Sequence, residues 1–259
     1  MESKIAKAIG VKYSPVAVVF TNEKPEPALQ FKEGRWGCAV SMLNAAAKGK
    51  TAVFDRQTFG CTGGGTGLGF GDTYKNFPGG IEYFLSTGNK EFTGTDMGRN
   101  IVRNMPALEH GERYVKTPAL ARKFIDALPI TDVPAEYVVF KPLADLKDGE
   151  VPEVVIFLAN PDQLSALAVL ANYARETTDN VIAPFGAGCH SVCIFPYREA
   201  KAENPRAIIG LTDVSARKQV DKDILSFTVP LKMFLEMESN VEGSFLENEE
   251  WLKVRERNQ

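Results

Sequence analysis

The chain has 259 residues, 44% of them hydrophobic and 24% charged, which is enough to form a globular protein with a buried core. Its 30 Lys and Arg against 33 Asp and Glu leave a net charge of −3, so no basic excess is available to bind a phosphate backbone. No apolar run approaches the roughly 20 residues that cross a bilayer, and the first one, at 16–20, is too short for a signal peptide. We therefore expect a cytoplasmic protein that binds neither nucleic acid nor membrane.

The first half of the chain has the pattern of a β-α-β unit. The apolar run at 16–20 predicts a strand that is buried on both faces. The segment 38–48 then predicts a helix, and 51–54 predicts a second strand. A glycine-rich loop at 60–71 follows, and after it the apolar residues of 77–85 recur at helical spacing.

The second half repeats this order. Strand, helix and strand are predicted at 154–158, 165–175 and 180–183, and a loop then leads to Gly188-Cys189. This dipeptide lies 128 residues after Gly60-Cys61, and the helical pattern of 77–85 recurs 150 residues on, at 227–235. We therefore expect an α/β protein of two pseudo-symmetric β-α-β halves, an internal duplication, packed around a shared central site.

Three segments follow from this duplication. The first α/β half is expected over 1–104. An irregular connector over 105–150 should contain a helix at 117–128 and a strand at 138–140. The second α/β half, with a late strand at 206–211 and a charged C-terminal helix from residue 247, is expected over 151–259.

The cysteines carry the strongest chemical signal. Three of the four, Cys38, Cys61 and Cys189, directly follow a glycine, which allows a sharp turn and a close approach to a bound group. Cys193 stands four residues after Cys189, so a helical turn would point both thiols the same way. Structural disulfides are not expected in a reducing cytoplasm. We expect all four thiols to meet between the two halves as metal ligands, with a [4Fe–4S] cluster as the preferred centre.

The glycine-rich loop is the second candidate feature. It holds seven glycines in the twelve residues 60–71, and successive backbone N–H groups could form an anion-binding nest. It lacks the spacing of a dinucleotide fingerprint and the lysine of a P-loop. We expect a loop packed against a cofactor, with a plain surface loop as the alternative. The expected cofactor contacts are Gly60, Thr62, Gly63, Gly64, Gly65, Gly188 and His190.

His190, which follows Cys189 directly, is the candidate catalytic residue, and it would hydrogen-bond a ligand sulfur or gate access to the centre. One alternative is a thiol enzyme that uses Cys189 with His190, and His110 is a candidate distant partner.

The other alternative is a non-catalytic module that binds haem or another small ligand in the cleft between the halves. Tyr74, Lys75 and Arg198 would then stand at the rim of that cleft.

The chain also resembles a known family. The likeness rests on the strand at 14–18, the helix that begins Cys38-Ala39, the Cys61 loop and the block Phe227-Thr228-Val229-Pro230-Leu231-Lys232-Met233. Together these resemble domain-of-unknown-function family 169, over most of the chain. The resemblance implies a cytoplasmic protein of archaea or largely anaerobic bacteria, and it implies no particular activity.

We therefore expect a cytoplasmic metalloprotein with a cysteine-ligated redox centre, which would make any enzyme activity that of an oxidoreductase. Its role would be electron transfer or small-molecule reduction, and its partner an electron-transfer protein or a small molecule. The sequence leaves the oligomeric state open, a homo-oligomer included.

Overall fold

The computed structural model describes residues 1–257, and these form two compact units. Unit 1 comprises Met1–Phe70 and the chain from Asp132 onward, and unit 2 comprises Gly71–Thr131. The boundaries of these units, after Phe70 and after Thr131, differ in position from the expected segment boundaries after residues 104 and 150. All four cysteines lie in unit 1.

Within the described residues, unit 1 is built on a seven-stranded sheet with the order β2-β3-β1-β4-β7-β6-β5. Neighbouring strands are antiparallel, except that β5 and β6 are parallel. The strands are β1 (Val16–Thr21), β2 (Ala52–Phe54), β3 (Tyr137–Pro142), β4 (Val154–Ala159), β5 (Val181–Ile182), β6 (Ala207–Gly210) and β7 (Leu225–Pro230). The predicted α/β class is confirmed in this coarse form.

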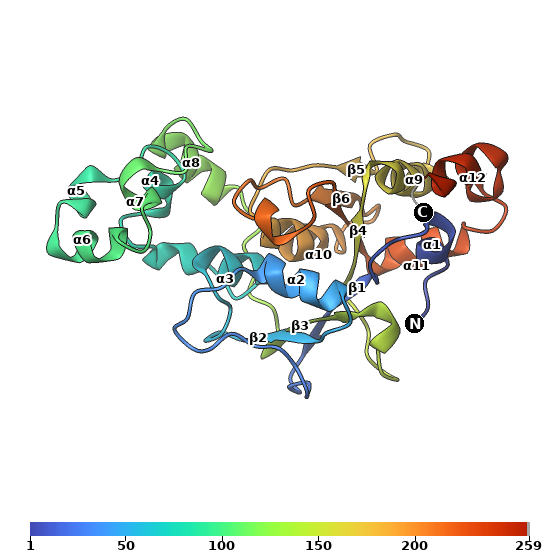
Figure 1. The fold of residues 1–259 in the computed structure, drawn as a ribbon, viewed down its shortest axis with the longest axis horizontal. Coiled ribbons are helices and arrows are strands. Elements are labelled where there is room, and N and C mark those ends of the chain that lie inside the picture. Colours follow the sequence, from blue (N-terminus) through green and yellow to red (C-terminus); the bar gives the residue numbers. More distant parts are fainter. Residues whose placement is uncertain (258–259) are drawn as a thin grey trace. The chain divides into compact units, whose positions relative to one another are not determined.

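Helices cover both faces of this sheet, and the alternation along β1 shows why. Val16 and Val18 point into one apolar core, while Ala17 and Val19 point into the other. Figure 1 shows α2 and α10 on one side of β1 and β4, with α9 and α11 on the other. The α-helices of unit 1 are α1 (Lys4–Ile9), α2 (Ala39–Ala47), α3 (Thr62–Leu68), α9 (Pro161–Asn172), α10 (Phe195–Glu199), α11 (Leu231–Ser239) and α12 (Glu249–Glu256). Short helical segments are η2 (Leu143–Asp145), the π-helix η3 (His190–Ile194), η4 (Arg217–Gln219) and η5 (Phe245–Glu247).

Unit 2 is helical throughout its described elements and has a small apolar core of its own around Tyr74, Ile81 and Ile125. An ion pair between Glu82 of α4 and Arg122 of α8 links its first and last α-helices. The elements are η1 (Thr73–Asn76), α4 (Ile81–Phe84), α5 (Lys90–Thr93), α6 (Asp96–Val102), α7 (Ala107–His110) and α8 (Pro118–Asp126).

Two local predictions are wrong. The glycine-rich segment is no loop: Thr62–Leu68 forms α3, and Gly64 to Leu68 are buried. Glycine disfavours helices by about 1 kcal/mol relative to alanine, so composition pointed away from a helix that tertiary packing stabilises. The helix expected at 227–235 begins only at Leu231, because residues up to Pro230 pair with β4 as part of strand β7.

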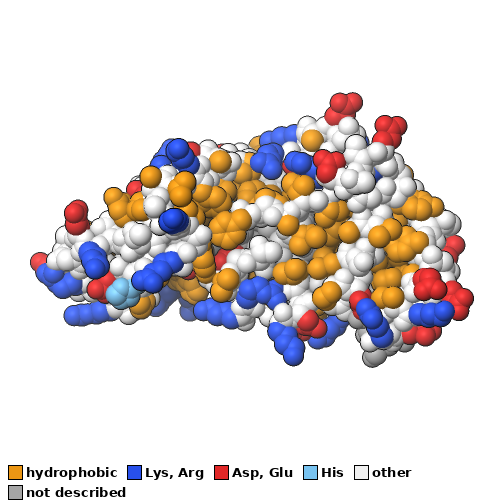
Figure 2. Space-filling view, turned by 90° about the horizontal axis from the view of Figure 1, so that it is seen from above, with side chains coloured by type: hydrophobic (Ala, Val, Ile, Leu, Met, Phe, Trp, Pro, Cys, Tyr) orange, Lys and Arg blue, Asp and Glu red, His pale blue; other side chains and the backbone are white. Residues whose placement is uncertain are grey.

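Apolar and charged side chains are interspersed on the surface. On the face shown in Figure 2, apolar side chains reach the surface between Lys, Arg, Asp and Glu side chains. Among the described residues, no helix is both long and apolar enough to cross a membrane.

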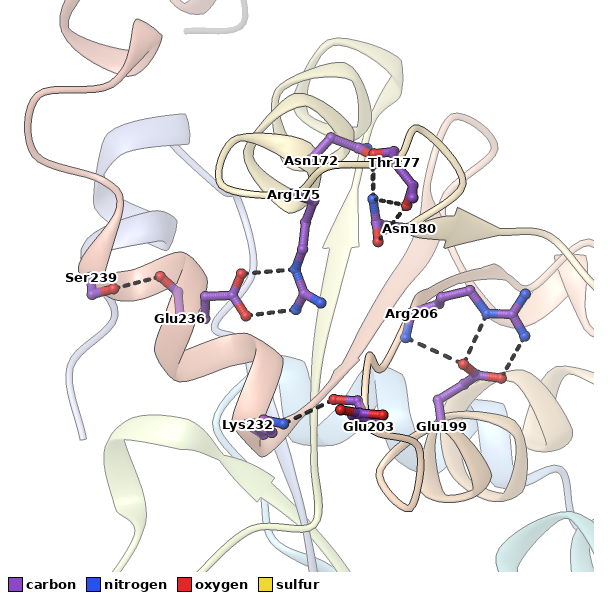
Figure 3. A network of polar contacts seen from close by, with 10 residues as sticks. All are labelled: Asn172, Arg175, Thr177, Asn180, Glu199, Glu203, Arg206, Lys232, Glu236 and Ser239. Atoms are coloured by element: carbon purple, nitrogen blue, oxygen red, sulfur yellow. Dashed lines mark hydrogen bonds and ion pairs between the residues drawn. The ribbon is translucent and has the colours of Figure 1, made fainter.

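Two bidentate ion pairs join helices of unit 1 to neighbouring segments (Figure 3). Arg175, after α9, donates to Glu236 of α11 at 2.8 and 2.6 Å. Glu199 of α10 accepts from the Arg206 guanidinium at 3.0 Å through each of its oxygens. Burial acts to raise the pKa of Glu199, but the hydrogen bonds and charge of Arg206 outweigh it and hold that pKa below its usual value.

We expect Glu199→Gln to lower the free energy of unfolding by about 2 kcal/mol at pH 7, because it breaks charge-assisted hydrogen bonds of a buried side chain. A carboxylate with a depressed folded pKa stabilises the fold above its unfolded pKa of about 4.3. That contribution disappears as the pH falls through the folded pKa. Urea unfolding should therefore show a gap between wild type and variant at pH 7 that closes in acid. A gap that stays constant would contradict this, and the exposed Glu203→Gln is the matched control.

Candidate functional site

Two cysteines stand directly before a helix, Cys38 as the N-cap of α2 and Cys61 as the N-cap of α3. Cys189 lies in the short helical turn that leads into the π-helix η3. The Cys61 sulfur accepts a hydrogen bond from the Gly64 N–H at 3.3 Å, which is the contact that a Ser or Asp oxygen usually makes at this position. The thiol of Cys61 is thereby directed at the first turn of its own helix.

The first two Gly-Cys turns are in contact, and the Gly188-Cys189 segment packs against the helices that follow them. Gly60 has a φ of +87°, and a Cβ there would lie 2.4 Å from the Gly37 carbonyl oxygen, so the turns before Cys61 and Cys38 are in backbone contact. A Cβ at Gly188 would lie 2.8 Å from a methyl group of Val40, in the first turn of α2. Only glycine allows approaches this close. The chain thus brings Cys38, Cys61 and Cys189 together, and we call these three residues the three-thiol cluster.

Helix α3 packs directly against Cys189 of this cluster. The Cys189 thiol donates to the Gly63 carbonyl oxygen at 2.9 Å. A Cβ at Gly67, one turn further on, would lie 2.5 Å from the Cys189 sulfur. The glycines of α3 therefore serve close packing between α3 and η3.

Burial controls the charge of the cluster. It raises the pKa of Cys189 well above the usual value, and the negative charges of Cys61, Cys38 and the Asp213 carboxylate add to the effect. Burial also raises the pKa of Cys61, opposed by the Gly64 N–H and reinforced by Cys38. The pKa of Cys189 thus responds to the charges of Cys61 and Cys38, and that of Cys61 to the charge of Cys38. Without a cation, Cys61 and Cys189 are neutral thiols at pH 7.

Cys193, the fourth predicted ligand, contacts a different part of α3 from Cys189. Its side chain is fully buried, and its sulfur lies 3.5 Å from the carbonyl oxygen of Leu68, the last residue of α3. Cys189 contacts the carbonyl of residue 63 in the first turn. At about 1.5 Å of rise per residue, those carbonyls are about 7.5 Å apart along the helix. Burial, and then the charge of Glu153, raise the pKa of Cys193.

His190 is buried beside the cluster and packs edge-on against the Phe195 ring at 5.7 Å between centroids. Burial lowers its pKa to about 4, so the imidazole is neutral at pH 7. A Cys–His catalytic pair needs the opposite shifts, a lowered thiol pKa and a raised imidazole pKa. His110 is exposed at the end of α7 in unit 2.

The three residues expected at the rim of a cleft separate between the units. Tyr74 is buried in the apolar core of unit 2, and Lys75 also belongs to unit 2. Arg198 belongs to α10 of unit 1. Among the predicted cofactor contacts, Gly64 and Gly65 are buried within α3, and Gly63 and Gly64 contact cysteine sulfurs through their backbone.

Sequence reasoning missed the residues that hold the Cys189 turn. Asp213 accepts from the Gly188 N–H at 3.3 Å. Ser191 donates to the Gly188 carbonyl at 2.8 Å and accepts from the Leu211 N–H at 3.2 Å. The available signal was a polar segment directly after the predicted strand at 206–211. These bonds clamp the Gly188-Cys189 turn between η3 and the end of β6.

Comparison with known proteins identifies the family of the chain. The model of domain-of-unknown-function family 169, described as "Uncharacterised ArCR", matches residues 4–240. The chain belongs to this family. The match includes all four cysteines and all seven described strands of unit 1 and ends before α12. No curated protein and no solved structure matches the chain. Family 169 membership therefore confirms the resemblance and assigns no activity.

In this member of family 169, the donor set of the cluster suits a soft metal, because thiolates are the ligands that iron–sulfur centres, zinc and copper(I) prefer. Among the described residues, however, no group of three or more His, Cys, Asp or Glu side chains is already arranged to hold a metal ion. The sulfurs of Cys61 and Cys189 make hydrogen bonds to backbone groups of α3 instead. Metal binding would replace these contacts by rotation of the cysteine side chains and would release the thiol protons.

Proposed function

We propose that this family 169 protein binds a thiolate-ligated redox centre at Cys38, Cys61 and Cys189 and uses it for electron transfer or the reduction of a small molecule. An iron–sulfur cluster is the preferred centre. The observation that carries the proposal is the packing of three Gly-Cys turns, from positions far apart in the sequence, around one place.

The cluster would supply one-electron chemistry, and the chain would supply its environment. The Gly64 N–H would donate to the Cys61 thiolate and stabilise its charge, as hydrogen bonds to ligand sulfurs do in iron–sulfur proteins. Asp213 and Ser191 would hold the Cys189 turn in place. Cys189 is buried, whereas Cys38 and Cys61 are partly exposed, so solvent and partners would reach the centre from the side of Cys38 and Cys61.

A cytoplasmic location remains part of the proposal. It is supported by four free cysteines, which are typical of reducing compartments.

The internal duplication also remains a proposal. In its favour, the first strands of the two expected halves, β1 and β4, are antiparallel neighbours in the middle of the sheet. Against it, a twofold axis between antiparallel strands runs perpendicular to the sheet and would place α2 and α9 on the same face. They cover opposite faces.

Metal analysis of protein prepared without oxygen tests the proposed function. We expect a brown protein with broad visible absorption that dithionite bleaches, and with iron and acid-labile sulfide in near-equal amounts. A sharp Soret band would assign haem instead. Colourless protein that takes up no metal during anaerobic reconstitution with iron and sulfide would overturn the proposal.

A further inference from the structure

We infer that the pocket between α9 and α12 binds a free α-amino acid with an apolar side chain. The pocket has a volume of about 330 Å³ and lies where these two helices pack side by side (Figure 1). Small-molecule sites typically measure about 300–1,000 Å³. A pocket at the lower end of this range suits a ligand of the size of an amino acid.

The pocket and the three-thiol cluster are on opposite faces of the sheet. Ala166 and Trp251, which line the pocket, belong to one apolar core, whereas Cys189 belongs to the core on the other face. Six of the ten lining residues come from the segment after residue 240, where the family match ends. The pocket is thus built partly outside the family-matched region, and its ligand can be tested without any metal.

One part of the pocket is apolar and preformed. The Nε1 of Trp251 donates to the Ala8 carbonyl at 3.2 Å, and the Trp251 ring packs edge-on against the Phe245 ring with 6.4 Å between centroids. On the α9 side, Val169 lines the pocket and is 48% exposed, so solvent reaches the apolar surface. An aliphatic or aromatic side chain that covers this surface would remove it from water.

A carboxylate and a guanidinium lie beside this apolar surface. Arg257, the C-cap of α12, donates to both oxygens of Asp162 in the first turn of α9, through Nε at 2.8 Å and through Nη2. Both residues line the pocket. The pocket therefore offers an acceptor for an ammonium group next to a bidentate donor for a carboxylate. An α-amino acid carries these two groups on one carbon atom.

The pairing of the two charges favours a zwitterion over a ligand with a single charge. An anion bound to Arg257 alone would face the Asp162 carboxylate, and a cation bound to Asp162 alone would face the guanidinium. A zwitterion gives each of them an opposite charge. The ion pair is solvent-exposed at Arg257, and exposed pairs contribute little to stability, so a ligand can displace it. The remaining charge in the lining, Glu250, has Lys253 at 3.9 Å.

Isothermal titration calorimetry of the full chain with L-leucine and L-phenylalanine tests the inference. We expect saturable binding of one amino acid per chain. N-acetyl-leucine lacks the ammonium group and leucinamide lacks the carboxylate. Each should bind more than about tenfold more weakly than leucine, because each loses one charge-assisted contact.

Two variants test the residues. Asp162→Asn and Arg257→Gln should each weaken leucine binding by more than about tenfold, for the same reason. The matched control is Glu249→Gln, which lies in the same helix as the pocket's α12 wall but does not line the pocket, and it should bind leucine like wild type. Circular dichroism verifies that each variant is folded.

Three results would overturn the inference. The first is the absence of saturable binding with either amino acid up to about 10 mM. The second is equal binding of leucine, N-acetyl-leucine and leucinamide, since the charged pair would then play no part in recognition. The third is wild-type affinity in both folded variants, which would place the ligand elsewhere on the chain.

Discussion

Cys38→Ala, Cys61→Ala and Cys189→Ala should each lose the metal centre, with iron per chain falling more than about tenfold in every variant. Changes to residues behind the ligands already weaken metal sites by about 10–100-fold, and these substitutions remove one of three ligands outright. The measurement is iron and acid-labile sulfide per folded chain after anaerobic reconstitution. Bound metal also stabilises the folded state, so wild type alone should gain thermal stability on reconstitution.

Cys193→Val, in the same helical segment as Cys189, tests the fourth predicted ligand: loss of iron would assign Cys193 to the centre, and full iron would exclude it. Full metal content in both Cys61→Ala and Cys189→Ala would contradict the ligand assignment. If only one of the three variants lost its metal, the other two cysteines would not be ligands. A centre held by all three cysteines would then be excluded.

Much of the secondary structure follows from the apolar pattern. The strands expected at 16–20 and 154–158 are confirmed as β1 and β4, and the helix expected at 38–48 is confirmed as α2. What the pattern cannot supply is strand order and direction. A strand covered on both faces is a continuous apolar run in a parallel or an antiparallel sheet alike, so nothing local indicates that β1 lies antiparallel to β4.

The cysteine site was predictable only through its glycines. The Gly-Cys dipeptides at 37–38, 60–61 and 188–189 indicate tight turns. The first two are in contact, and the third packs against Val40 of α2 and Gly67 of α3. The spacing of Cys193 after Cys189 suggested a shared direction. In the structure Cys189 stands before the π-helix and Cys193 lies within it, and their sulfurs meet α3 carbonyls five residues apart. Asp213 escaped prediction because its role depends on a backbone N–H 25 residues earlier, a contact that only the folded chain creates.

The glycines of α3 lead to a second prediction with a large effect: Gly67→Ala should lower the free energy of unfolding by about 1–3 kcal/mol, the usual cost of overpacking a core. The new methyl carbon would lie 2.5 Å from the Cys189 sulfur, 2.8 Å from its Cβ and 3.0 Å from its backbone carbonyl carbon. Rotation of the thiol relieves only the first of these contacts. The other two require α3 and η3 to separate.

That separation is what connects stability to function in this protein. On its own, alanine should improve the helix by about 1 kcal/mol over glycine, so a net loss measures the contact with Cys189 directly. Because the displaced element carries a proposed ligand, Gly67→Ala should also reduce the metal content of a chain that retains every cysteine. Gly94→Ala is the control, since the added Cβ would have its nearest neighbours 3.3 Å away and the residue lies in unit 2.

The test compares the two variants by chemical denaturation and by iron analysis. Unchanged stability in Gly67→Ala would mean that α3 and η3 are not packed through this glycine, and the close approach that brings Cys189 to the first turn of α3 would have to be abandoned.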